Sequence, residues 1–251
     1  MAHILLDSVS VEFPVYHVDA RSIKKQLINF STGGKLLKSS HHSFIVKAID
    51  DMTLTLHDND SVGVIGCNGS GKSTLLRLLA GIYVPQSGKM DVQGKISSIL
   101  DMNLGLNPEA TGYENIIMRG ILLGFTKREM LERLDEIAEF TELGDYLIAP
   151  VRTYSTGMML RLAFGVVTSV QPEILLLDEV VGTGDAHFME KAKERLTQLI
   201  KSSNIVVLSS HAIEIIQELC NKVLIMHKGK VMFFGSTEEG IDYYRKETFN
   251  N

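Results

Sequence analysis

The sequence has little cysteine, no long apolar run and no strong excess of charge. Its two cysteines, Cys67 and Cys220, are too few for a disulfide framework and suit a reducing compartment. No stretch approaches the roughly 18 to 20 apolar residues that span a bilayer, and Asp7 and Glu12 interrupt any apolar start, so no secretion signal is expected. A net charge of -5 gives no support to a nucleic-acid surface.

The bulk composition is that of an ordinary globular protein. The chain has 251 residues, of which 45% are hydrophobic and 22% charged. This length permits one large α/β domain, or one domain with an inserted subdomain. The sequence contains no internal repeat and no low-complexity tail.

A glycine-rich segment carries the most specific signal in the sequence. It fits the phosphate-binding pattern G-x-x-x-x-G-K-[ST] and consists of Gly66, Cys67, Asn68, Gly69, Ser70, Gly71, Lys72, Ser73 and Thr74. A short buried-strand pattern, 61–65, precedes it, and 74–80 is rich in helix formers. Strand, glycine loop and helix are the arrangement that a triphosphate site requires.

The residue types in this loop match the chemistry of phosphate binding. Glycines let the backbone turn tightly and bring successive N–H groups near phosphate oxygens, and the following helix directs its positive end at the same anion. Lys72 adds a charge for the outer phosphates, and the Ser73 hydroxyl can bind Mg²⁺. The alternative is a glycine-rich turn that binds nothing.

Two further apolar runs predict central parallel strands that end in polar residues. The runs are 174–177, followed by Asp178 and Glu179, and 205–208, followed shortly by His211. We expect Asp178 to be the second Mg²⁺ contact and Glu179 the general base for an attacking water. His211 could contact the terminal phosphate or position that water. The alternatives are a surface acid pair and a structural histidine.

The other expected elements complete an α/β pattern. Thr111 and Glu114 fit a capping box that opens a helical stretch reaching about residue 145. Residues 154–158 open another helix that runs through Val170. Strands are predicted at 4–13, as a pair within 44–56, within 88–100, and as a hairpin of 223–226 and 231–234.

Residues 17–43 differ from the rest because they are polar and basic. Within them, Ile23, Leu27 and Phe30 have the spacing of a short amphipathic helix. This polar insertion is interpreted either as a surface segment whose helix packs on its own domain, or as a contact for a membrane partner or lipid headgroups.

Taken in order, these motifs resemble the ATP-binding subunit of ABC transporters across nearly the whole chain. The phosphate loop, the signature Tyr154-Ser155-Thr156-Gly157-Met158, the pair Asp178-Glu179, the D-loop 182–185 and His211 occur in the family order. The signature departs from the commonest form, L-S-G-G-Q. Its Y-S-[ST]-G-M form, the start 11–16 and the segment 111–115 look like polysaccharide exporters, closest to O-antigen and teichoic-acid export ATPases.

This resemblance implies a fold and a domain plan. The fold is α/β, a RecA-like P-loop core with an antiparallel β subdomain and an inserted α-helical subdomain. Residues of about 1–101 and 171–251 form the catalytic core and β subdomain, and about 102–170 form the helical subdomain. Since the sequence ends at Asn251, we expect no C-terminal carbohydrate-binding domain, and selection of the polymer by the membrane subunit or upstream enzymes.

The resemblance also implies a composite site in a head-to-tail homodimer. Ser155 and Gly157 of one copy contact the γ-phosphate of ATP held by the other, and Asp185 belongs to the nucleotide contacts. Phe13 is the first candidate for stacking on adenine, and Tyr16 is the second. The family often has a glutamine where this chain has Leu100-Asp101-Met102-Asn103, so either Asp101 or Asn103 could substitute for it.

The implied activity is ATP hydrolysis, with ATP and Mg²⁺, that energises export of a lipid-linked polysaccharide resembling O-antigen. The partners are a second copy and a multi-span permease, with the polysaccharide contacted only indirectly and no nucleic acid. The location is peripheral, at the cytoplasmic face of the bacterial inner membrane. The alternatives are an ABC ATPase for another exported cargo and a soluble ABC ATPase outside transport. Soluble ones usually carry long coiled coils or two nucleotide domains, which this sequence lacks.

Overall fold

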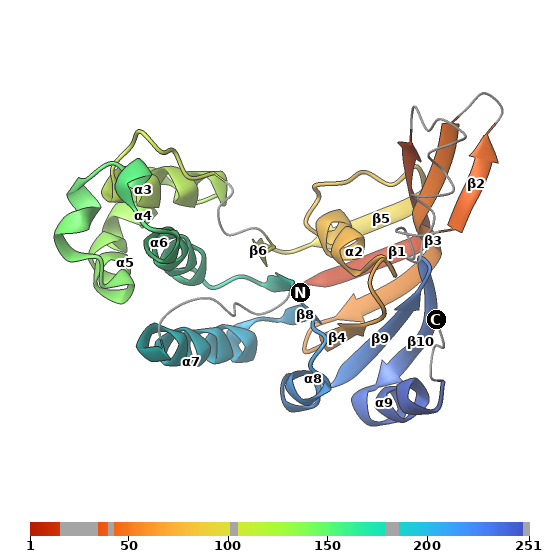
Figure 1. The fold of residues 1–251 in the computed structure, drawn as a ribbon. Coiled ribbons are helices and arrows are strands. Elements are labelled where there is room, and N and C mark those ends of the chain that lie inside the picture. Colours follow the sequence, from red (N-terminus) through yellow and green to blue (C-terminus); the bar gives the residue numbers. More distant parts are fainter. Residues whose placement is uncertain (16–34, 40–42, 101–104, 179–185, 248–251) are drawn as a thin grey trace.

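A computed structural model describes residues 1–15, 35–39, 43–100, 105–178 and 186–247 (Figure 1). Within them, two sheets pack around one helix, and a group of helices projects to one side. No helix in these ranges is both long and apolar enough to cross a membrane.

The first sheet is antiparallel and has the order β2-β3-β1-β5. Its strands are β1 (His3–Val15), β2 (Lys35–Ser39), β3 (Ser43–His57) and β5 (Ser87–Gln93). The pair of strands predicted within 44–56 is wrong, because β3 is continuous. Asp50 and Asp51 interrupt the apolar pattern, and the chain accommodates them by a bulge in which Asp51 has φ 55° and donates its N–H to Ser10 Oγ at 3.0 Å.

The polar insertion is partly a strand. Residues 35–39 form β2, which pairs with the start of β3. A strand was not predicted there. The helix predicted around Ile23, Leu27 and Phe30 lies outside the described residues and stays a prediction.

The second sheet is the parallel core and has the order β10-β9-β4-β8-β7-β6. Its strands are β4 (Ser61–Ile65), β6 (Ile96–Ile99), β7 (Ile174–Asp178), β8 (Ile205–Ser209), β9 (Lys222–His227) and β10 (Lys230–Ser236). All neighbours are parallel except β9 and β10, which form the predicted hairpin. The runs predicted as central strands are fully buried in β7 and β8.

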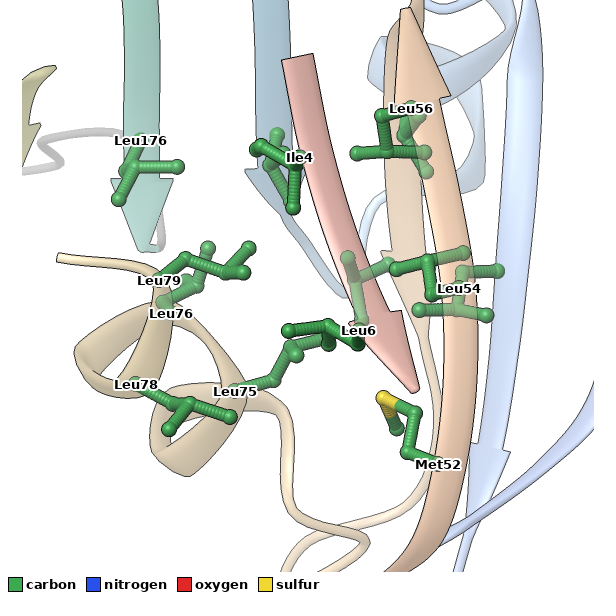
Figure 2. Close-up of a cluster of buried hydrophobic side chains, with 14 of the residues drawn as sticks. Ile4, Leu6, Met52, Leu54, Leu56, Leu75, Leu76, Leu78, Leu79 and Leu176 are labelled. Atoms are coloured by element: carbon green, nitrogen blue, oxygen red, sulfur yellow. The ribbon is translucent and has the colours of Figure 1, made fainter. Parts of the chain in front are cut away.

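Helix α2 (Lys72–Leu79) lies between the two sheets, directly after the glycine-rich loop. Figure 2 shows its leucines pointing at Ile4 and Leu6 of β1, at β3, and at Leu176 of β7. The leucines at 75, 76, 78 and 79 are essentially inaccessible to solvent. Truncating one such side chain typically costs about 2–5 kcal/mol, so packing fixes the helix whose first turn carries Lys72 and Ser73.

The helices of the inserted part are α3 (Gly112–Leu122), α4 (Lys127–Glu132), α5 (Leu134–Thr141) and α6 (Thr156–Thr168), with two 3₁₀ turns at Gly144–Ile148 and Val151–Thr153. The capping box of Thr111 and Glu114 is confirmed. The predicted helical stretch divides because a second capping box, Thr126 with Glu129, starts α4 after Gly124, which has φ 90°. Helices α7 (Ala186–Ser202), α8 (Ile213–Leu219) and α9 (Thr237–Lys246) belong to the core.

Candidate active site

Two glycines of the phosphate loop occupy positions where a side chain does not fit. A Cβ on Gly66 would lie 2.4 Å from the Met226 carbonyl oxygen, and one on Gly71 would lie 2.4 Å from that of Ala48. Gly71 also has φ 108°, which side chains rarely adopt. The loop is therefore held closely between β3 and β9, and its backbone can curve around an anion.

The turn between β9 and β10 ties the loop to the antiparallel sheet. The Gly229 N–H donates to the Ser70 carbonyl at 2.9 Å, and the Gly229 carbonyl accepts from the Asp50 N–H at 2.9 Å. The Asp50 carboxylate pairs with Lys47 at 3.2 Å and with Lys230 at 3.5 Å. The hydrogen bond from Lys47 holds the pKa of Asp50 below its ordinary value. The hairpin thus supports the loop from behind.

Lys72 lies in the first turn of α2 and is buried. Its Nζ donates to the Gly66 carbonyl at 2.7 Å and to the Cys67 carbonyl at 3.2 Å. These bonds hold the ammonium group within the curve of the loop, beside the unsatisfied N–H groups of the helix N-terminus. Charge and helix dipole therefore favour an anion at the same place.

The loop opens into a cavity of about 450 Å³. Its walls come from the loop, from α2 and from the ends of β6, β7 and β8, and the lining residues are Asn68, Gly69, Gly71, Lys72, Ser73, Thr74, Leu100, Asp178, Ser209 and His211. The register of the parallel strands explains why these residues line one cavity, because Ser209 lies opposite both Val64 of β4 and Asp178 of β7. Parallel strands bring their carboxyl ends to one edge.

The donor set of this cavity fits a magnesium–triphosphate. A serine hydroxyl (Ser73) and a carboxylate (Asp178) are hard oxygen ligands of the kind that Mg²⁺ prefers. Within the described chain, the buried Oγ atoms of Ser70 and Ser209 have no hydrogen-bond partner. Buried polar atoms without a partner are uncommon, and Ser209 lines the cavity directly. Sequence reasoning did not single out Ser209, although its place at a strand end was readable.

Comparison with known proteins agrees with this geometry. The family model described as ABC transporter matches residues 49–182. The O-antigen export system ATP-binding protein RfbE of Yersinia enterocolitica is 43% identical over 231 residues, covering 92% of this chain and 97% of the relative. The chain belongs to the ABC transporter family. The predicted family is thereby confirmed.

Other members of the family are similar along most of their length. The teichoic acids export ATP-binding protein TagH of Shouchella clausii is 34% identical over 241 residues, covering 96% of this chain and 64% of the relative. A solved ATP-binding subunit of an ABC transporter superposes with a TM-score of 0.69 at 20% identity, covering 97% of this chain and 92% of that one. The predicted P-loop α/β fold is confirmed.

The ABC signature lies at the start of α6 and does not line the cavity of its own chain. Ser155 is the N-cap: its Oγ accepts the Met158 N–H at 3.2 Å and its carbonyl accepts the Met159 N–H at 3.0 Å. The N–H groups of Thr156 and Gly157 precede the first helical hydrogen bonds, and both residues are exposed. The start of α6 is therefore exposed to solvent and is separate from the residues that line the cavity.

Several predicted site residues are not brought to the cavity or cannot be placed. Phe13 is half-buried at the end of β1, its ring edge-to-face with Tyr83 at 5.3 Å, and is not a lining residue. The Cys67 Sγ lies 3.8 Å from His227 Nδ1 and also does not line the cavity. The candidates outside the described residues are Tyr16, Asp101, Asn103, Glu179 and Asp185.

Proposed function

We propose that this ABC ATPase energises export of a lipid-linked polysaccharide through a separate membrane permease. The observation that carries the proposal is the 43% identity to an O-antigen export ATP-binding protein, over 97% of that relative. The second support is the relative named as a teichoic acids export ATP-binding protein, because its name also describes an export system. The cavity supplies the phosphate chemistry that such a role needs.

Different residues of the site are assigned to the phosphates, to Mg²⁺ and to the adenine of ATP. Lys72 and the loop N–H groups hold the outer phosphates of ATP, and the α2 dipole adds to their attraction. Ser73 and Asp178 would hold Mg²⁺, which when bound would neutralise charge on the phosphate oxygens. We assign adenine stacking to Phe13 or Tyr16, which stays a prediction.

Hydrolysis needs a water that is positioned and deprotonated. Glu179 follows Asp178 at the end of β7 and is the proposed general base. His211, two residues beyond the end of β8, lines the cavity and would orient the water or the terminal phosphate. Water attacks the γ-phosphorus, the β–γ oxygen bridge breaks at that phosphorus, and ADP and phosphate leave.

The site is completed by a second copy of the chain. The signature N-terminus of α6 is exposed to solvent and does not line its own cavity, so Ser155 and Gly157 would close over the ATP of a partner in a head-to-tail dimer. Asp185 is assigned to the same interface. Dimer closure on ATP and release after hydrolysis would move the permease at the cytoplasmic face of the inner membrane.

Glu179→Gln tests both the base and the composite site. The amide keeps the size of the side chain and cannot accept the proton, so we expect unchanged ATP affinity, a loss of turnover of about a hundredfold or more, and an ATP-bound dimer by analytical ultracentrifugation. Glu190→Gln is the matched control, since Glu190 is an exposed carboxylate of α7. A monomeric Glu179→Gln variant with normal hydrolysis refutes the proposal.

Transport is tested separately by the partner. Affinity purification of the tagged chain from its native membrane should recover a multi-span membrane protein. Recovery of the chain alone, with full ATPase activity and no membrane partner, would favour a soluble ABC ATPase.

A further inference from the structure

Glu142 has a backbone conformation that its residue type does not favour. It caps the C-terminus of α5 with φ 56° and ψ 29°, in the left-handed region. Helices commonly end in this conformation, but glycine or asparagine usually occupies the position because a Cβ is strained there. A glutamate in such a place points to a role for its side chain.

The Glu142 carboxylate joins three helices. Its Oε1 lies 2.9 Å from Lys191 Nζ of α7, and its Oε2 lies 3.5 Å from Arg161 Nη1 of α6. His187 of α7 lies 3.8 Å away, is 78% exposed, and contributes only when protonated. The hydrogen bond from Lys191 holds the pKa of Glu142 below its ordinary value. One carboxylate at the end of α5 thus bridges α6 and α7.

Aromatic rings also contact the two cations that pair with Glu142. Arg161 stacks over Phe188 at 4.8 Å, and Lys191 lies over Phe140 at 5.1 Å. The rings of Phe140, Phe164 and Phe188 pack on one another at 5.6 to 6.1 Å. Each cation therefore contacts an aromatic ring as well as the Glu142 carboxylate, and together these contacts join α5, α6 and α7.

One of the two bridged helices begins within the segment assigned to the composite site. Helix α6 begins at Thr156, within the signature, and it packs against α7, which begins at Ala186. We propose that Glu142 is a positioning residue that fixes α6 against α7, and with it the start of α6, in the orientation needed to contact the ATP of a second copy. It acts through Arg161 and Lys191 and touches no nucleotide. This inference rests on the composite site proposed above.

We expect the Glu142 bridge to affect the stability of the ATP-bound dimer and not the affinity of the phosphate loop for nucleotide. Glu142 is not among the residues that line the cavity, so its loss leaves the first nucleotide contact unchanged. Its side chain is 33% exposed, and ion pairs of this kind contribute modestly. We therefore expect a change in the dimer dissociation constant of about three- to tenfold for two lost pairs.

The test measures ATP-dependent dimerisation in the Glu179→Gln background. Adding Glu142→Gln should weaken the ATP-bound dimer by about three- to tenfold, while the affinity of the monomer for a fluorescent ADP analogue stays within about twofold. Lys191→Gln should change dimerisation in the same direction, and the double variant should be less than additive because both remove one bridge.

Two carboxylates of α5 serve as controls. Glu139 is exposed on the same helix, and Glu139→Gln should change nothing. Glu136 pairs with Arg195 of α7 at 2.5 Å, so Glu136→Gln breaks a bridge from α5 to α7 without touching Arg161. It should lower the thermal midpoint without changing dimerisation. A general loosening of the helices would instead affect the Glu136 and Glu142 variants alike, which would overturn the positioning role.

The two possible failures are distinguishable. If Glu179→Gln alone forms no ATP-dependent dimer, the composite site is refuted and this inference with it. If that variant dimerises and Glu142→Gln leaves its dissociation constant unchanged, only the role of Glu142 is refuted.

Discussion

Replacing Gly157 by alanine separates a role in the fold from a role toward ATP. Gly157 is exposed in the first turn of α6, and a Cβ placed there meets only Ser155 Oγ, at 3.9 Å. The backbone needs no left-handed conformation at this position. Alanine is favoured over glycine in helices by up to about 1 kcal/mol. We therefore expect the free energy of unfolding to stay equal or to rise by less than about 1 kcal/mol.

The same methyl group should be harmful once a second copy closes over the signature. The Gly157 N–H is assigned to the γ-phosphate of the partner's ATP; alanine keeps this N–H, but we expect its methyl group to hold the phosphate away from it. Losing one preorganised donor to a developing negative charge costs about 2.7–4 kcal/mol, or roughly a hundred- to a thousandfold in turnover. We expect Gly157→Ala to lose at least about tenfold in kcat.

The assay is steady-state phosphate release, with thermal unfolding and nucleotide titration on the same preparation. Gly124→Ala is a contrasting control: Gly124 has φ 90°, and a Cβ at this position would have no atom within 4 Å, so alanine is strained without a clash. It should lower stability by about 1 kcal/mol and leave hydrolysis intact. Wild-type turnover by Gly157→Ala would refute the assignment of Gly157 to the partner's ATP.

The loop and the helix bridge support three further predictions. Gly71→Ala should lower the free energy of unfolding by about 2 kcal/mol or more and abolish ATP binding, because the position combines a strained φ with a clash against a backbone carbonyl. Gly81→Ala is the control: Gly81 has φ 73° but open space around a Cβ, so the free energy of unfolding in chemical denaturation should fall by only about 1 kcal/mol. A bulky maleimide should label native Cys67 and weaken ATP binding. It should spare Cys220, which is buried and has a pKa raised to about 11. Normal ATP binding by a chain that mass spectrometry shows to be fully labelled at Cys67 would contradict this. The pKa of Glu142 is lowered in the folded chain, so its ionised form stabilises the fold at pH values above the ordinary pKa of 4.5. The difference in thermal midpoint between wild type and Glu142→Gln should therefore vanish as the pH falls through the folded pKa. A difference that does not depend on pH would rule this out.

The short-range chemistry of the site was readable from the sequence. A phosphate loop needs glycines, lysine and serine at fixed spacing, because one backbone turn and one helix start must present them together. Strand ends carrying Asp178 and His211 were readable for a similar reason, since continuous apolar runs mark central parallel strands. The structure places both residues in one cavity with Ser73.

Strands that are defined by pairing with remote parts of the chain could not be predicted from the sequence. The run 44–56 looked like two strands because Asp50 and Asp51 break its apolar pattern, and only pairing with β1 shows that a bulge absorbs them. The strand at 35–39 was hidden in a polar segment because an edge strand is defined by the neighbour it pairs with.

The family, the phosphate chemistry and the order of motifs could all be predicted from the sequence, since these reside in neighbouring residues. Only the packing of remote segments shows that Ser209 joins the cavity, that the Gly229 turn clamps the loop, and that Glu142 bridges α6 and α7. These hydrogen bonds and ion pairs join distant parts of the chain, so they form only when the strand register and the helix packing have brought those parts together. The signature at Gly157 belongs to both: the family resemblance implied its residues and their action on a second copy, and the structure shows that it lies outside the residues that line its own cavity.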